Sequence, residues 1–128
     1  MPHLQFDINK KINAKTKKKM MEKLINIFSE IMETGNEHVA VSIREFSQHN
    51  LSLGRTKPGE LICLGNIDLR VGRTEVQKRK LSTSVIRIFY EYLEIKTKNQ
   101  YITFTEHRGE DFNLFERNLP NWKKDDLK

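Results

Sequence analysis

PHLQFDI, residues 2–8, decides the fold, because apolar and polar side chains alternate along it. Strict alternation is the pattern of a β-strand with one buried face. After a cap at Asn13, apolar residues recur at steps of three and four as far as residue 32, which is typical of the buried face of a helix. Thr34 and Gly35 end that helix, and residues 38–46 alternate again. The sequence therefore begins with a strand, a helix and a second strand.

The same order of elements returns at an offset of 61 residues. Asp7 aligns with Asp68, and Phe28 aligns with Phe89, without a gap. Residues 61–69 predict a third strand, and a second helix and a fourth strand follow it. We interpret this self-similarity as the duplication of a strand–helix–strand unit.

The duplication predicts an α/β (α+β) fold with one four-stranded sheet and both helices on one face. A right-handed crossover makes the two strands of each unit parallel. The repeats run over about 2–46 and 61–107 in a single domain, 1–128, that ends in a C-terminal tail, 108–128. The chain leaves the second face of the sheet uncovered, which predicts an oligomer. The aromatic side chains of the tail are expected to pack against a neighbouring subunit: Phe112, Phe115 and Trp122.

Composition limits the function classes that need to be considered. No apolar run approaches the ~20 residues that a membrane span needs, and the N-terminus has no signal-peptide pattern. Cys63 is the chain's one cysteine, which excludes an internal disulfide and suits a reducing, cytoplasmic compartment. The histidines and Cys63 show no metal-ligand spacing, so neither a metal nor another cofactor is expected.

The net charge of +6 raises the question of nucleic-acid binding. Seven lysines crowd residues 10–23, where Glu22 is the sole acidic residue. We interpret this lysine-rich stretch as the solvated face of a surface helix. RNA-recognition domains have the same order of elements, but they display aromatic residues on a central strand. Residues 63–69 contain none, so nucleic acid is not the expected partner.

Three features together resemble the tautomerase superfamily: MPHLQFDI (residues 1–8), the duplicated unit, and LRVGRT (residues 69–74) before the second helix. The resemblance covers residues 2–122. It is closest to the single-chain, 4-oxalocrotonate tautomerase-like group that includes cis-3-chloroacrylic acid dehalogenase and malonate semialdehyde decarboxylase. The family implies a homotrimer with the sheets around a central barrel. It also implies that Pro2 is the catalytic base, and that Arg70 and Arg73 bind the substrate carboxylate.

The chemistry of an N-terminal proline supports these roles. Aminopeptidases remove Met1 before a small residue, which leaves Pro2 with a secondary amine. An α-amino group titrates near pH ~8, and the ring nitrogen of proline is somewhat more basic. An apolar pocket and nearby guanidinium groups disfavour the ammonium form and move the pKa towards neutrality, where a general base works best. The arginines could hold a carboxylate and stabilise a developing enolate.

These residues predict an isomerase, a keto–enol tautomerase that needs no cofactor and acts on a 2-oxo or 2-hydroxy-dienoate acid. Two alternatives remain open at this point. One is a non-catalytic trimeric binding protein on the same fold, and the other is a promiscuous decarboxylase or hydratase relative.

Hydrolytic dehalogenation is not expected. The dehalogenases have a histidine, a tyrosine and a glutamate where this chain has, in order, Ser29, Thr103 and Leu114. Glu110 and Glu116 lie close enough to position 114 that a shift in register would bring one of them there. Glu37, before the second strand, is a loose candidate for the acidic residue of the decarboxylase.

Overall fold

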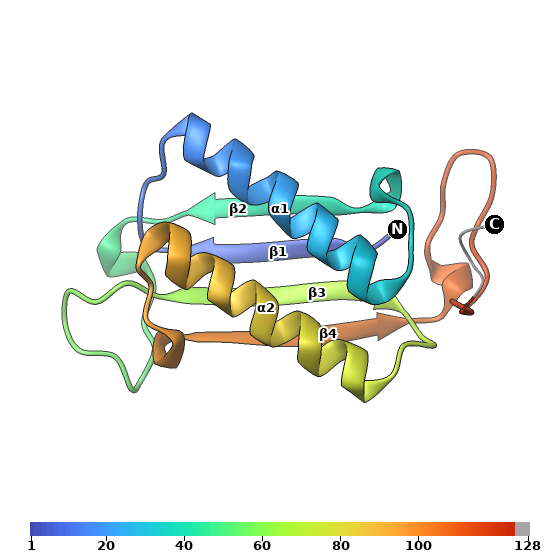
Figure 1. The fold of residues 1–128 in the computed structure, drawn as a ribbon. Helices are drawn as coiled ribbons and strands as arrows, with labels where there is room; N and C mark the ends of the chain where they lie inside the picture. Colours follow the sequence, from blue (N-terminus) through green and yellow to red (C-terminus); the bar gives the residue numbers. More distant parts are fainter. Residues whose placement is uncertain (125–128) are drawn as a thin grey trace.

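Two helices cover one face of a four-stranded sheet in the computed structural model, which describes residues 1–124 (Figure 1). The last four residues of the expected tail, 125–128, lie outside the described residues. The main elements follow one another in this order: β1 (His3–Ile8), α1 (Ala14–Met32), β2 (Ala40–Glu45), β3 (Cys63–Arg70), α2 (Glu75–Leu93) and β4 (Gln100–His107).

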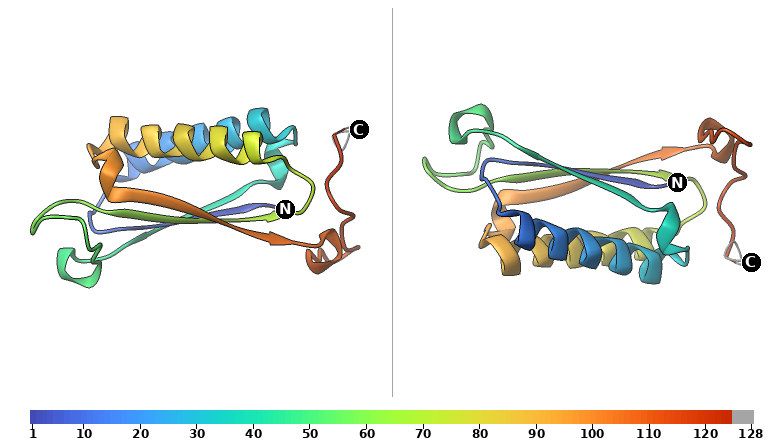
Figure 2. Two further views of the ribbon diagram at one scale, coloured as in Figure 1. Left: turned by 90° about the horizontal axis from the view of Figure 1, so that it is seen from below. Right: turned by 90° about the horizontal axis from the view of Figure 1, so that it is seen from above.

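The strands lie in the order β2-β1-β3-β4. β1 pairs parallel with β2, β3 pairs parallel with β4, and the two halves join through the antiparallel pair of β1 and β3. The predicted fold class is confirmed, including the parallel strands within each unit. Both helices lie on the same side of the sheet, as the two views of Figure 2 show.

The offset of 61 residues also relates the two helices. α1 and α2 each span 19 residues, and their first and last residues differ by that offset. Asn13 caps the first helix and Thr74 caps the second, in each case by accepting a hydrogen bond from the backbone N–H three residues later. Both helices end on a glutamate in the left-handed conformation, with φ of 51° at Glu33 and 58° at Glu94. The halves are therefore equivalent down to their caps.

The core lies between the helices and the inner face of the sheet. The apolar positions that alternate along β1 are fully buried, and so are the stripe residues of α1. The rings of Phe6 on β1 and Phe89 on α2 lie 4.7 Å apart and join the sheet to the helix layer. Cys63 starts β3 with no exposed surface, and its burial raises the pKa of the thiol above the ordinary value.

The outer face of the sheet is polar. Gln5 on β1 donates a hydrogen bond to Asp68 on β3 at 2.5 Å, and Arg44 on β2 donates to Asp7 on β1 at 2.6 Å. Asn66 accepts a further hydrogen bond from Thr103 on β4 at 2.9 Å. No helix of this chain covers this face within residues 1–124 (Figure 2).

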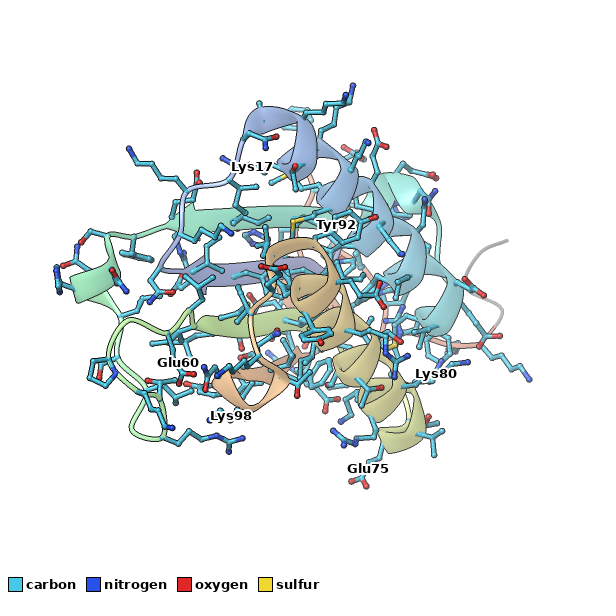
Figure 3. The ribbon with its side chains drawn as sticks, turned by 60° about the vertical axis from the view of Figure 1, so that its left-hand side comes forward. Lys17, Glu60, Glu75, Lys80, Tyr92 and Lys98 are labelled. Carbon is cyan, nitrogen blue, oxygen red and sulfur yellow. The ribbon has the colours of Figure 1, made fainter. Side chains whose placement is uncertain are left out.

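The lysine-rich stretch lies at the start of α1 and is largely exposed. Lys17 forms an ion pair with Glu45 at 2.6 Å, and the ammonium group of Lys23 lies 5.6 Å from the ring of Tyr92. Figure 3 shows Lys17 and Tyr92 at the same end of the helix layer. The structure therefore places the stretch on a solvated helix face. No helix within residues 1–124 is long and apolar enough to cross a membrane.

Candidate functional site

Pro2 lies at the end of the sheet where β1 begins and where β3 and β4 end, which we call the proline end. Figure 1 shows that α1 ends, α2 begins and the C-terminal tail runs at this same end. Pro2 is buried, and its carbonyl accepts a hydrogen bond from Ala40 N–H at 2.9 Å. His3 stands opposite Asp68 in the antiparallel register, so Pro2 lies beside the last residues of β3.

Arg70 is the last residue of β3, and it is only 7% exposed. One nitrogen of its guanidinium, Nη1, donates a hydrogen bond to the carbonyl of Pro120 at 2.7 Å. The end of β3 therefore places the buried guanidinium of Arg70 at the proline end, where the Pro120 carbonyl of the tail is its hydrogen-bond acceptor. Pro2 and Arg70 come to this end of the sheet on two neighbouring strands.

Arg73 lies in the turn between β3 and α2 and is 8% exposed. Its Nη2 donates to the carbonyl of Met32, the last residue of α1, at 3.2 Å. The final carbonyls of a helix lack partners within the helix and form its negative end, so a cation is stabilised there. Arg73 therefore caps α1, a structural role that the sequence did not predict.

The tail closes over both arginines. The Arg73 guanidinium lies 4.5 Å from the ring centroid of Trp122, which is itself 8% exposed. Trp122 donates its backbone N–H to Val71 O at 3.1 Å and its indole N–H to Glu33 O at 3.4 Å. The expectation that Trp122 packs against a neighbouring subunit is wrong, because its own chain buries it. Phe112 is partly buried and meets the ring of His107 edge-on at 5.3 Å, and its contact with a neighbouring subunit stays a prediction.

Sequence reasoning also missed an acid–histidine pair on the outer face. His107, the last residue of β4, lies 2.9 Å from the carboxylate of Asp68. The two residues are 39 positions apart, and nothing in the local sequence links them. Among residues 1–124, no group of three or more His, Cys, Asp or Glu side chains could hold a metal ion.

The three candidate glutamates are solvent-exposed. The carboxylate of Glu37 lies 3.6 Å from the ring of its neighbour His38. Glu110 forms an ion pair with Arg108 at 2.8 Å, and Glu116 lies on the exposed part of the tail. None of the three has a hydrogen bond or ion pair with Pro2, Arg70 or Arg73 among the contacts described for residues 1–124.

The fold is shared with several solved structures. The chain aligns with a wild-type fused 4-OT symmetric trimer at a TM-score of 0.81 and 16% identity, over 91% of this chain and 94% of the other. It aligns with N1, a member of the cis-3-chloroacrylic acid dehalogenase family, at a TM-score of 0.79 and 19% identity, over 93% and 84%. A third, Pt0534 inactivated by 2-oxo-3-pentynoate, gives a TM-score of 0.80 and 14% identity, over 91% and 94%.

The similarity to known proteins comes from the comparison of structures alone. Neither a scan against protein-family models nor a search of curated proteins gave a match. The TM-scores establish a common fold, and sequence identities below 20% leave the chemistry of individual residues to be argued from this chain. The sequence motifs and the structural comparisons agree on one point: this chain has the tautomerase fold.

Proposed function

We propose that this protein is a cofactor-independent tautomerase of 2-oxo or 2-hydroxy-dienoate acids, with Pro2 as general base and acid. The observation that carries the proposal is the burial of Pro2 at the same end of the sheet as two buried arginines, Arg70 and Arg73. Pt0534, which has the same fold, is inactivated by a 2-oxo acid, and this supports the proposed class of substrate.

Removal of Met1 is part of the proposal. While Met1 is attached, the nitrogen of Pro2 is an amide that cannot accept a proton. After removal, the neutral secondary amine takes the proton of the enol hydroxyl, and the electron pair forms the new C=O bond as the double bond shifts. The resulting ammonium then returns the proton to carbon. Arg70 binds the substrate carboxylate, which fixes the reacting carbon near the amine, and Arg73 stabilises the enolate charge.

We further propose that the protein is a homotrimer in the cytoplasm. The helices described within residues 1–124 leave the polar outer face of the sheet uncovered, and the fused 4-OT structure with the same fold is a trimer. The outer face would then supply the contacts between subunits. The single buried Cys63 suits a reducing compartment.

Two measurements test the catalytic proposal. Intact mass spectrometry determines whether Met1 is absent, and ketonisation of phenylenolpyruvate is then compared in wild type and Pro2→Ala. Pro2→Ala replaces the ring-held secondary amine by an unconstrained primary amine, so we expect kcat to fall about a hundredfold. Pro58→Ala, in the exposed loop before β3, is the matched control and should keep the wild-type rate.

Retention of Met1 on active protein would rule out Pro2 as the base, and so would an unchanged rate in Pro2→Ala.

The arginines are tested separately. We expect Arg70→Ala to raise KM, because a lost charge-assisted hydrogen bond weakens carboxylate binding. Arg87→Ala, on the exposed side of α2, should leave KM unchanged.

A further inference from the structure

We propose that Trp122 is a positioning residue of the carboxylate site, and that the carbonyl of Pro120 occupies the place on Arg70 that a substrate carboxylate oxygen takes. The inference rests on the proposed function for the chemical class of the ligand. It does not depend on whether Pro2 is the base.

Trp122 is held from three sides. Its indole N–H donates to Glu33 O at the end of α1, and its backbone N–H donates to Val71 O in the turn after β3. Its ring lies against the Arg73 guanidinium at 4.5 Å. A cation over an indole face is attracted by the partial negative charge on the face of the neutral π-system, and here both partners are largely removed from water. Trp122 therefore keeps Arg73 in one orientation.

Gly72 shows how closely the tail is fitted to this turn. A Cβ atom on Gly72 would lie 2.4 Å from the carbonyl oxygen of Trp122. On the other side of the tail, Gly109 donates its N–H to Asn121 Oδ1 at 2.7 Å. The path of the tail across the proline end is thus fixed by specific contacts.

Pro120 is the part of this path that has to move for a ligand to replace its carbonyl, which also lies closely against Gly109. It is exposed, whereas Leu119 before it and Trp122 after it are each 8% exposed and act as anchors. A groove of about 540 Å³ lies beside it, lined by Arg108, Glu110 and residues 118–121. A small ligand that shifts the Pro120 carbonyl would reach Arg70, and it would change the surroundings of Trp122 two residues later, while the contacts of Trp122 hold its ring on Arg73.

Replacing the Pro120 carbonyl by a substrate carboxylate as the acceptor on Arg70 is chemically favourable. The Pro120 carbonyl is a neutral acceptor that makes one hydrogen bond to Arg70 at 2.7 Å. A carboxylate carries a full charge and can accept two N–H groups of a guanidinium side by side. Such charge-assisted bonds are about twice as strong as neutral ones. A 2-oxo acid should therefore displace the carbonyl.

The first test uses the intrinsic fluorescence of Trp122, the only tryptophan of the chain. Pyruvate is titrated into the full-length protein, with pyruvamide as the uncharged control. We expect a saturable change in emission with pyruvate that is absent with pyruvamide and in Arg70→Ala. Asn121→Ala removes the hydrogen bond from Gly109 N–H to Asn121 Oδ1, which frees the segment around Pro120, and it should lower the Kd for pyruvate. No emission change, or an unchanged or higher Kd in Asn121→Ala, would overturn the displacement.

The second test separates positioning from general stability. Trp122→Leu removes the aromatic face, and we expect KM to rise about tenfold while kcat stays within about twofold. Trp122→Phe keeps an aromatic face and should retain most of the wild-type KM. Phe115→Leu, at a fully exposed position of the same tail, is the control. Equal effects of the Leu and Phe variants on KM would contradict the positioning role.

The readouts also separate this inference from the proposed function. If Trp122→Leu does not fold, the pyruvate titrations of Asn121→Ala and Arg70→Ala still decide the matter. If Pro2→Ala keeps the wild-type rate but pyruvate still displaces the tail, the catalytic proposal fails and the carboxylate site remains.

Discussion

At Gly72 both the backbone conformation and the surrounding atoms disfavour a side chain. Its φ of 129° is a conformation that side chains disfavour, and a Cβ atom there would collide with Trp122 O. We expect Gly72→Ala to lower the free energy of unfolding by about 1 to 3 kcal/mol, measured by urea denaturation.

Gly54→Ala is the matched control for that prediction. A Cβ atom at Gly54 has no neighbour within 4 Å, and its φ is not in the left-handed range. The substitution should therefore change the stability by less than about 0.5 kcal/mol. If the two variants were equally stable, the close approach of the tail at Gly72 would be in doubt.

Glu60, at the end of the long loop before β3, has the most perturbed carboxylate of the described residues. The hydrogen bond from Lys96, at 2.6 Å, and then the Lys57 backbone N–H lower its pKa from 4.5 to about 2. A depressed pKa in the folded state contributes stability above pH 4.5, and this contribution is lost as the pH falls from there towards 2.

An NMR titration of the Glu60 carboxyl tests this assignment. We expect Lys96→Met to raise the pKa of Glu60 towards its ordinary value. Lys80→Met serves as the control, because Figure 3 shows Lys80 on the opposite side of the molecule from Glu60. A pKa of Glu60 that does not move in Lys96→Met would contradict the role of this ion pair.

At the scale of elements, the start of α2 is defined by a capping box. Thr74 Oγ1 accepts from Gln77 N–H at 3.1 Å, and Gln77 Oε1 accepts from Thr74 N–H at 3.0 Å. We expect Thr74→Ala to cost about 1 to 2 kcal/mol of unfolding free energy in thermal or urea denaturation. Thr83→Ala, within the same helix, should cost less than about 0.5 kcal/mol. An equal fall in the free energy of unfolding in both variants would contradict a stabilising role for the capping box.

Elements were predictable where a local signal exists. The cap Asn13 was identified from sequence, because capping depends on residues three positions apart. The second strand was predicted two residues too long at its start. Asn36–His38 forms a 3-10 turn instead, with His38 N–H bonded to Gly35 O, and no periodic pattern marks such a turn.

The candidate site was predictable only in part, for the same reason. Strand order places Pro2 and Arg70 at one end of the sheet. Periodicity predicts the strands themselves, but it does not predict which strands are neighbours. The partners of the arginines are a different matter. Arg73 bonds to the main-chain carbonyl of Met32, 41 residues away, and every residue has such a carbonyl. The contact with Trp122 likewise depends on how the tail folds back.

For the whole molecule, the proposed trimer makes the outer face of the sheet an interface. Thr103 lies on that face and hydrogen-bonds to Asn66. We expect Thr103→Arg to prevent assembly, because it would bury an uncompensated charge between subunits. Light scattering should then give the chain mass of 15.2 kDa instead of about three times that value. Glu91→Arg, on the exposed side of α2, should remain trimeric.

Cys63, at the first position of β3, offers a direct view of how this architecture opens. It has no exposed surface, and burial keeps its thiol protonated, so a thiol reagent cannot react with the folded chain. Reaction therefore requires the core to open at the start of β3, where Cys63 pairs with Ile8 of β1 and with Gln100 of β4. The labelling rate of this sulfur reports how often that end of the sheet opens.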